Sequence, residues 1–216
     1  MTYLQIVNAV LKRLRQPTVA TIAENTYATM IAEFVNQAKR ECEDAWSWLQ
    51  QEDIHNITAT TGIDSYTLTD FGKRSQVLRV HNLTTKGTIL SISRERMERY
   101  SDFTDVANSE PSYWRINGQS GDDPIIQFYP TPGSIYIIRV YGRVPQDDLA
   151  VETDILTIPE YPVILGAYYL AVSERGDDRG NALPQAQSEY QQALSDAIAI
   201  DNSNRVEGMA TDWVVA

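Results

Sequence analysis

The stretch that decides the fold is residues 31–62, IAEFVNQAKRECEDAWSWLQQEDIHNITATTG, because the spacing of its apolar residues changes within it. Up to Leu49 the apolar residues recur every three or four positions, which is the period of one buried helix face. After Gln51 the chain turns to short β-branched runs separated by glycine and aspartate, a pattern typical of strands. The stretch therefore predicts a long helix over residues 26–50 that leads into a β-rich region.

Several side chains of this helix have a predicted place. Cys42 lies on the apolar stripe, where a small core residue is expected rather than a reactive thiol. As the single cysteine of the chain, it also excludes an internal disulfide. Just upstream, Thr21–Glu24 matches the pattern of a capping box. Four charged residues fall mostly on the face opposite the stripe: Lys39, Arg40, Glu41 and Glu43.

Helical spacing recurs at both ends of the chain. Residues 3–15 show it, and Pro17 closes that helix. The run PVILGAYYLAVSERG is apolar on nearly every side, so a helix over residues 161–175 should be deeply buried. A last helix is predicted over residues 185–201. The simplest packing joins the four helices in one bundle built from both chain ends.

The sequence pattern in the middle of the chain predicts β-strands. YWRINGQ leads to PIIQFYP, and the link TPGS, residues 131–134, is a strong turn signal before IYIIRVYGRV. In this last run Ile137 and Tyr141 should point to one side, whereas Ile138 and Val140 point to the other. The charged run SISRERMERYSDF is expected to form a short helix or an exposed loop.

The predicted class is thus α+β: a helical bundle built from both chain ends, an inserted antiparallel β-sandwich-like domain and an extended C-terminal arm. The predicted boundaries are 1–50 for the N-terminal helices, 51–160 for the β-rich insertion, 161–204 for the C-terminal helices and 205–216 for the arm.

Charge restricts the function. The net charge is −11, and residues 151–216 alone carry eleven acids and three bases, a net charge of −8. Such a surface repels phosphate backbones and argues against tight binding of DNA or RNA. The longest strongly apolar run, Val163–Val172, has ten residues, and a membrane-spanning helix needs about 20. The N-terminus does not read as a signal peptide, since its basic residues follow its apolar ones.

Sequence patterns for catalysis are sparse. His55 and His81 have no partner at metal-ligand spacing. The doublets Asp122–Asp123, Asp147–Asp148 and Asp177–Asp178 stand in predicted turns, where aspartate accepts hydrogen bonds from the backbone. We therefore predict no catalytic residue, no metal and no cofactor. Two other classes stay open: a monomeric module whose β insertion binds a ligand or host surface, and a cell-wall hydrolase with paired carboxylates.

One long run carries a family resemblance. Residues 125–180, IIQFYPTPGSIYIIRVYGRVPQDDLAVETDILTIPEYPVILGAYYLAVSERGDDRG, resemble the head-to-tail adaptor proteins of tailed phages, of the tail tubular protein A type. The shared features are a strand with YPTP, a VYGRVP-like stretch, an aspartate before IP, and a helix rich in alanine and tyrosine. The C-terminal segment is similar as well, and the order of these motifs carries the resemblance.

The resemblance implies a function. Such adaptors form a twelve-fold ring under the portal protein, extend the DNA channel and present a platform to the next tail component, a nozzle or tail-tube protein. DNA would pass without specific binding, and no membrane is involved. The chain would be made in the host cytoplasm and would reside in the virion, in the tail at the head–tail junction. Four acids are expected to line the channel or a solvated face: Glu152, Asp154, Asp177 and Asp178.

The last seven residues, ATDWVVA, are unusually apolar for a chain end. Burying one large apolar side chain contributes about 1.5–3 kcal/mol, so three of them favour a docked tail. The partner-binding residues predicted here are Thr211, Asp212, Trp213, Val214 and Val215. The expected partner is the portal protein or an adjacent adaptor, and a tail strapped onto its own helices is the alternative.

Overall fold

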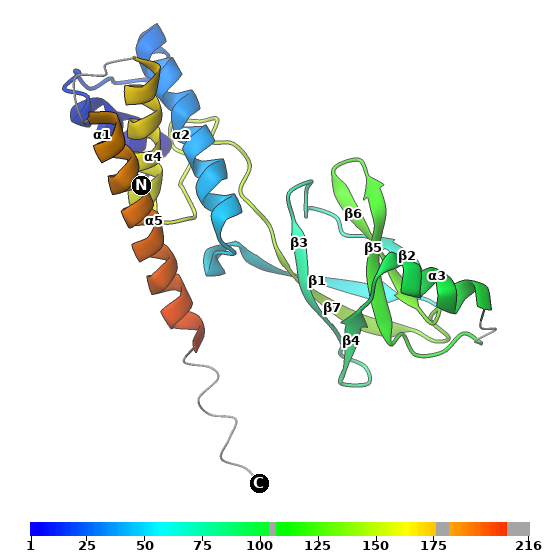
Figure 1. The fold of residues 1–216 in the computed structure, drawn as a ribbon. Helices are drawn as coiled ribbons and strands as arrows, with labels where there is room; N and C mark the ends of the chain where they lie inside the picture. The colour runs from blue at the N-terminus through cyan, green and yellow to red at the C-terminus, as the bar shows by residue number, and fades with distance from the viewer. Residues whose placement is uncertain (104–106, 176–181, 207–216) are drawn as a thin grey trace. The chain divides into compact units, whose positions relative to one another are not determined.

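The computed structural model describes residues 1–103, 107–175 and 182–206 (Figure 1). Within these ranges the chain is a mixed α+β protein with five α-helices and seven β-strands. The α-helices are α1 (Tyr3–Arg13), α2 (Thr26–Ala45), α3 (Arg94–Phe103), α4 (Glu160–Glu174) and α5 (Ala182–Val206). Two short 3-10 helices, η1 (Ile22–Glu24) and η2 (Leu49–Gln51), flank α2.

The chain divides into two compact units. The helical unit combines residues Met1–Gln51 with the chain from Gln146 onward, and the β unit is Glu52–Pro145. Each unit has its own cluster of buried apolar residues. The β unit is therefore an insertion between two segments that fold together.

Side-chain caps set the starts of α1 and α2. Thr2 and Gln5 form a reciprocal capping box, in which each side chain accepts a hydrogen bond from the backbone of the other. The side chain of Asn25 accepts a bond of 2.8 Å from the backbone of Ala28 and caps α2. The capping box predicted at Thr21–Glu24 is wrong, because Thr21 makes no cap bond and α2 begins only after Asn25.

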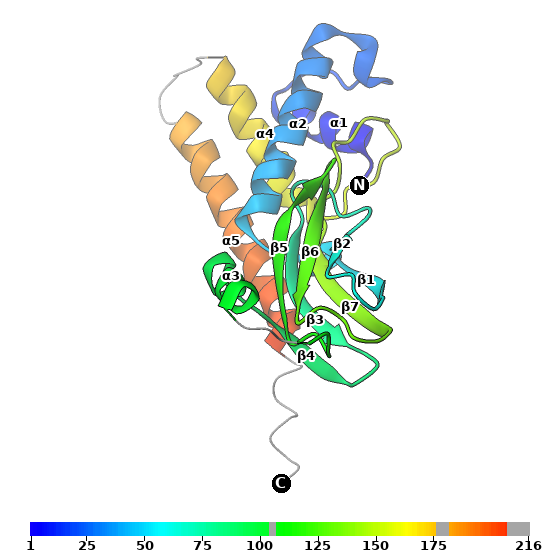
Figure 2. The same cartoon turned by 90° about the vertical axis from the view of Figure 1, so that its right-hand side faces the viewer.

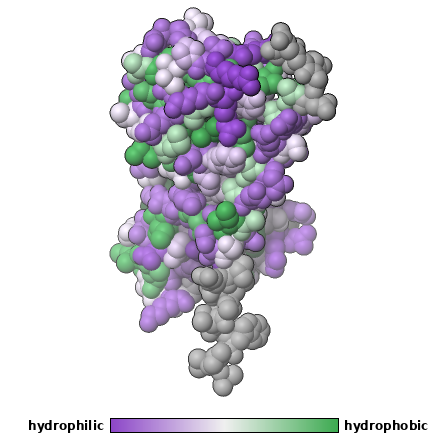
Figure 3. Space-filling model, turned by 90° about the vertical axis from the view of Figure 1, so that its left-hand side faces the viewer, coloured by the Kyte–Doolittle hydropathy of each residue, from purple (hydrophilic) through white to green (hydrophobic). Residues whose placement is uncertain are grey.

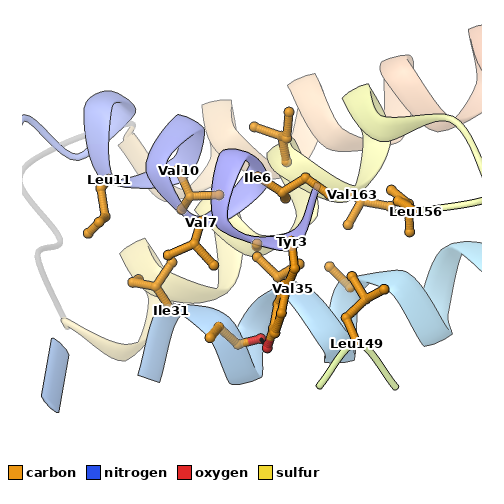
Figure 4. Packing of buried hydrophobic residues seen from close by; sticks show 14 of the residues in the cluster. Tyr3, Ile6, Val7, Val10, Leu11, Ile31, Val35, Leu149, Leu156 and Val163 are labelled. Atoms are coloured by element: carbon orange, nitrogen blue, oxygen red, sulfur yellow. Dashed lines mark hydrogen bonds between the residues drawn. The ribbon is translucent and has the colours of Figure 1, made fainter. Parts of the chain in front are cut away.

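The core of the helical unit lies between α1, α2 and α4 (Figure 4). Ile6, Val7 and Val10 of α1 meet Ile31 and Val35 of α2, all five without solvent exposure. As predicted, α4 is deeply buried, and α2 and α5 both pack along it. Figure 1 shows these three helices side by side.

Gly166 permits the close approach of the three helices. A Cβ atom at this position would lie 3.0 Å from the Cβ of Ala38 and 3.1 Å from the ring of Tyr190. These neighbours belong to α2 and α5, so a glycine in α4 lets both pack tightly against it.

The segment that follows the β unit also packs on the helices. Leu149, Leu156 and Ile158 are buried in the helical core. The side chain of Asn36 donates to the carbonyl of Leu149 at 3.0 Å and accepts from its amide at 2.9 Å. The structure thus places residues 146–160 in the helical unit, whereas the sequence pattern assigned them to the β-rich insertion.

The β unit is one seven-stranded sheet that nearly closes on itself (Figure 2). The strand order is β1-β7-β3-β4-β5-β6-β2, and every pair is antiparallel except β4–β5. Both halves of the sheet contribute to one apolar core. The strands are β1 (Glu52–Ala59), β2 (Ser65–Thr67), β3 (Gln76–Asn82), β4 (Gly87–Ser91), β5 (Tyr113–Ser120), β6 (Asp123–Tyr129) and β7 (Tyr136–Arg143).

The strand predictions hold in part. The β5–β6 hairpin forms as expected, and the alternation of β7 is confirmed, since Ile138 and Val140 are buried and Ile137 is exposed. The TPGS link joins β6 to β7, but these strands do not pair: β6 lies between β5 and β2, and β7 between β1 and β3. The link therefore carries the chain from one half of the sheet to the other.

Candidate functional site

The histidines and the cysteine occupy structural positions. Among the described residues no cluster of three or more His, Cys, Asp or Glu side chains is arranged to hold a metal ion. His55 packs edge-on against Phe71, and a ring nitrogen of His81 lies 3.2 Å from the hydroxyl of Thr88. Cys42 is a buried core residue, as predicted, and burial raises the pKa of its thiol to about 12. A thiol of this kind is a weak nucleophile at neutral pH.

The acid doublets are not brought together. Asp122 pairs with Lys73 at 2.8 Å, and the carboxylate of Asp123 accepts from the amide of Gly72 at 2.9 Å. Asp148 pairs with Arg40. Asp177 and Asp178 lie outside the described residues.

Two of the acids expected at a channel or solvated face have local partners. The carboxylate of Glu152 accepts from the amide of Ile22 at 3.1 Å. Asp154 accepts from the amides of Ala150 and Val151, each at 2.8 Å. These backbone hydrogen bonds lower the pKa of Asp154. Both carboxylates therefore stabilise the connection between β7 and α4, and a role at a channel remains a prediction.

A buried ion pair lies at the end of α2 near the β unit insertion. Lys39 and Glu43 are 3.3 Å apart, and neither side chain is exposed. The ammonium of Lys39 also donates to the carbonyls of Gln146 and Asp147. Glu43 accepts from the side chain of Gln51 at 2.9 Å and from the amide of Gln146 at 3.2 Å.

The sequence pattern placed Lys39 and Glu43 mostly on the face opposite the apolar stripe of α2. This prediction is wrong for these two residues, because both side chains are buried. The chain segments at Gln51 and Gln146 cover that side of α2 and exclude water from it. The four-residue spacing of Lys39 and Glu43 was the available signal, because oppositely charged residues at this spacing meet on a helix. It does not reveal that the pair is buried.

A shallow groove runs along the last turns of α5. It has a volume of about 290 Å³, and its apolar lining includes Tyr161, Ala197 and Ile200. Tyr161 and Ile200 are 56% and 65% exposed. At its edge, Asp201 accepts hydrogen bonds from the indole of Trp46 and the amide of Leu49, so this acid holds α5 to the end of α2.

The face drawn in Figure 3 shows no single continuous apolar patch over the helices. In Figure 3, hydrophilic and hydrophobic residues are interspersed over the helices. No helix in the described ranges is both long and apolar enough to cross a membrane.

The predicted partner-binding residues of the arm, Thr211, Asp212, Trp213, Val214 and Val215, all lie outside the described residues. The described part of the chain ends at Val206 in α5, which begins three residues earlier and ends five residues later than the helix predicted over 185–201.

The side chains described above stabilise the fold, and an apolar groove lies along α5. A comparison with protein-family models identifies the class: the model of the SU10 adaptor protein matches residues 1–211. The chain belongs to this family of phage head-to-tail adaptors, which are structural proteins, and the resemblance seen in the sequence is confirmed. No curated protein sequence matches the chain.

Proposed function

We propose that the chain is a head-to-tail adaptor that joins the portal protein to the next tail component and extends the DNA channel. It acts as a twelve-fold ring of copies in the virion, at the head–tail junction, after synthesis in the host cytoplasm. The observation that carries the proposal is the family match over residues 1–211. The nozzle or tail-tube protein is the partner on the tail side.

The division into two units supports this function. Each unit has its own apolar core, and a unit with its own core can present a binding surface independently. An adaptor needs two such surfaces, because it binds different proteins on the head side and on the tail side.

The distribution of charge supports passage of DNA without binding. Residues 1–51 and 146–216 carry eighteen acids and eight bases, a net charge of −10, whereas residues 52–145 have a net charge of −1. An acidic wall repels the phosphate backbone and does not retain the DNA. The helical unit is therefore the better candidate for the channel lining.

The C-terminal arm is the proposed portal contact. Trp213 is the kind of aromatic anchor that dominates protein interfaces, and Val214 and Val215 extend its apolar surface. In a ring, the first docked arm raises the effective concentration of the others, so individually weak contacts act together.

Deletion of residues 207–216 tests the proposal through two measurements on the same protein. We expect attachment to portal-bearing heads to be lost and the melting temperature of the free chain to be unchanged. Trp213→Ala should reproduce the loss of attachment, whereas the control variant Glu207→Gln, outside the predicted partner-binding residues, should attach normally. Intact attachment together with a melting temperature several degrees lower would instead show that the arm packs on its own helices.

A further inference from the structure

The β unit exposes an unusual set of side chains on the outward side of β1, β7 and β3, which pair in register side by side. We call this surface the outer sheet face. Its aliphatic members Ile54, Ile137 and Leu83 are 50%, 49% and 38% exposed. Its other members include Arg79, Arg139 and Tyr141, with His81 and Asn56 directly opposite Arg139. Exposed aliphatic side chains grouped on one sheet face are typical of an interaction surface.

The polar members of the outer sheet face are already held in place. The guanidinium of Arg79 lies over the ring of Tyr141, 4.3 Å from its centroid. Arg139 donates from Nε to the side chain of Asn56 at 3.1 Å. Side chains fixed before binding lose little rotamer freedom when a partner docks. Tyrosine and arginine among apolar neighbours is also the composition of interface hot spots.

The charge of this face indicates the chemistry of its partner. Arg79 and Arg139 lie near its middle, and the acid Glu52 lies at one end, 3.8 Å from Arg79. A partner with exposed carboxylates on a rigid surface would complement the positive charge of the two arginines. The helical unit of the same chain is acidic, since residues 1–51 and 146–216 carry a net charge of −10.

The helical unit offers a specific complement on α2. Arg40, whose charge is paired with Asp148, is exposed on one side of this helix. Glu33, Gln37, Glu41 and Asp44 are exposed on the same side. We call these four residues the α2 ridge. From Glu33 to Asp44 the ridge extends about 16 Å at 1.5 Å per residue. The face extends about 13 Å along β7 from Ile137 to Tyr141, at about 3.3 Å per residue, so the two lengths are similar.

We infer that the outer sheet face of one copy binds the α2 ridge of a second copy. The inference rests on the proposed function, in which copies of the chain assemble into a ring. When two copies form this contact, one keeps a free ridge and the other keeps a free face. Such a head-to-tail contact can continue from copy to copy and closes into a ring when the rotation allows it.

Paired charge-reversal variants test the contact by sedimentation velocity in 50 mM and 500 mM salt. The face variant is Arg79→Glu with Arg139→Glu, and the ridge variant is Glu33→Lys with Glu41→Lys. Wild type should self-associate at low salt and dissociate at high salt, because salt screens exposed charges. Each variant alone should sediment as a 24.3 kDa monomer.

An equimolar mixture of the two variants distinguishes this contact from a general charge effect. The intact ridge of the face variant can bind the intact face of the ridge variant, and the two reversed surfaces complement each other as well, so we expect the mixture to associate again at low salt. A chain with all four substitutions should self-associate again. The matched control is Arg94→Glu with Arg99→Glu on α3, which changes the net charge equally and should leave self-association unchanged. Circular dichroism melts establish that every variant is folded.

The inference is overturned if the mixture stays monomeric, if wild type does not associate at low salt, or if the α3 control behaves like the face variant. It is also overturned if the face variant self-associates normally and loses only the next tail component, since the face would then bind that protein. Attachment of wild type to portal-bearing heads without face–ridge pairing would reject this inference and retain the adaptor function.

Discussion

Lys39 and Glu43, one helical turn apart on α2, form an ion pair in which both side chains are completely buried. The pair also binds Gln51 and Gln146, the residues at which the chain leaves and re-enters the helical unit. Two side chains on one helix therefore fix both ends of an insertion of more than ninety residues.

Removal of one member of this pair should destabilise the protein. Glu43→Gln or Lys39→Met leaves one buried charge without its partner, which costs about 3–5 kcal/mol. Replacement of both by Met and Leu should recover much of that loss, because no unpaired charge remains. Urea unfolding measures the change, with the exposed Glu41→Gln as the control expected within about 0.5 kcal/mol of wild type. Additive losses in the double variant would contradict this account.

A larger residue at position 166 should loosen the packing of α4. Gly166→Val introduces atoms where a Cβ would already lie within 3.0–3.1 Å of Ala38 and Tyr190. Overpacking of this kind costs about 1–3 kcal/mol. Thermal unfolding should show the loss, whereas Ala199→Val on the exposed side of α5 should have little effect. Equal stability of the two variants would mean that the helices can separate at Gly166 without cost.

Asp154 should contribute to stability in a pH-dependent way. Backbone hydrogen bonds hold its pKa below the ordinary value of 3.8, so its contribution is present above pH 3.8 and is lost as the pH falls further. Asp154→Ala should therefore melt below wild type at pH 7, and the difference should shrink toward pH 3. Melting curves of both proteins at a series of pH values test the sign. A difference that grows on acidification would refute the assignment.

Cys42 should resist modification in the folded protein. Its pKa of about 12 lowers the thiolate fraction at neutral pH roughly a thousandfold relative to a free cysteine, and burial blocks access as well. A thiol reagent such as dithionitrobenzoate should react slowly with native protein and rapidly in guanidinium. Fast reaction under native conditions would show that α2 opens away from α5, which lies against Cys42 through Tyr190.

Local patterns in the sequence were sufficient for several elements. The 3.6-residue period placed α2 and the buried α4, and the two-residue period separated Ile138 from Ile137 in β7. The order of the motifs over residues 125–180 identified the family. The helix and strand features depend on neighbours a few residues apart along the chain, so periodicity reveals them, whereas the family resemblance rests on the order of the motifs.

Other features depend on which distant segments meet. The TPGS link has the composition of a hairpin turn, yet β6 and β7 pair with different strands because the sheet curls around a shared core. Residues 146–160 have no clear period, yet they fill the core beside α1 and α2. The outer sheet face joins three strands that are far apart in sequence order.

The Lys39–Glu43 pair shows the difference most directly. Its four-residue spacing is visible in the sequence and is equally compatible with a solvated ion pair. Only the tertiary structure decides that the pair is buried, because burial comes from Gln51 and Gln146, which fold over α2 from opposite ends of the β unit. Local spacing determines which groups can meet on one element, whereas the exclusion of water depends on distant segments that the spacing does not describe.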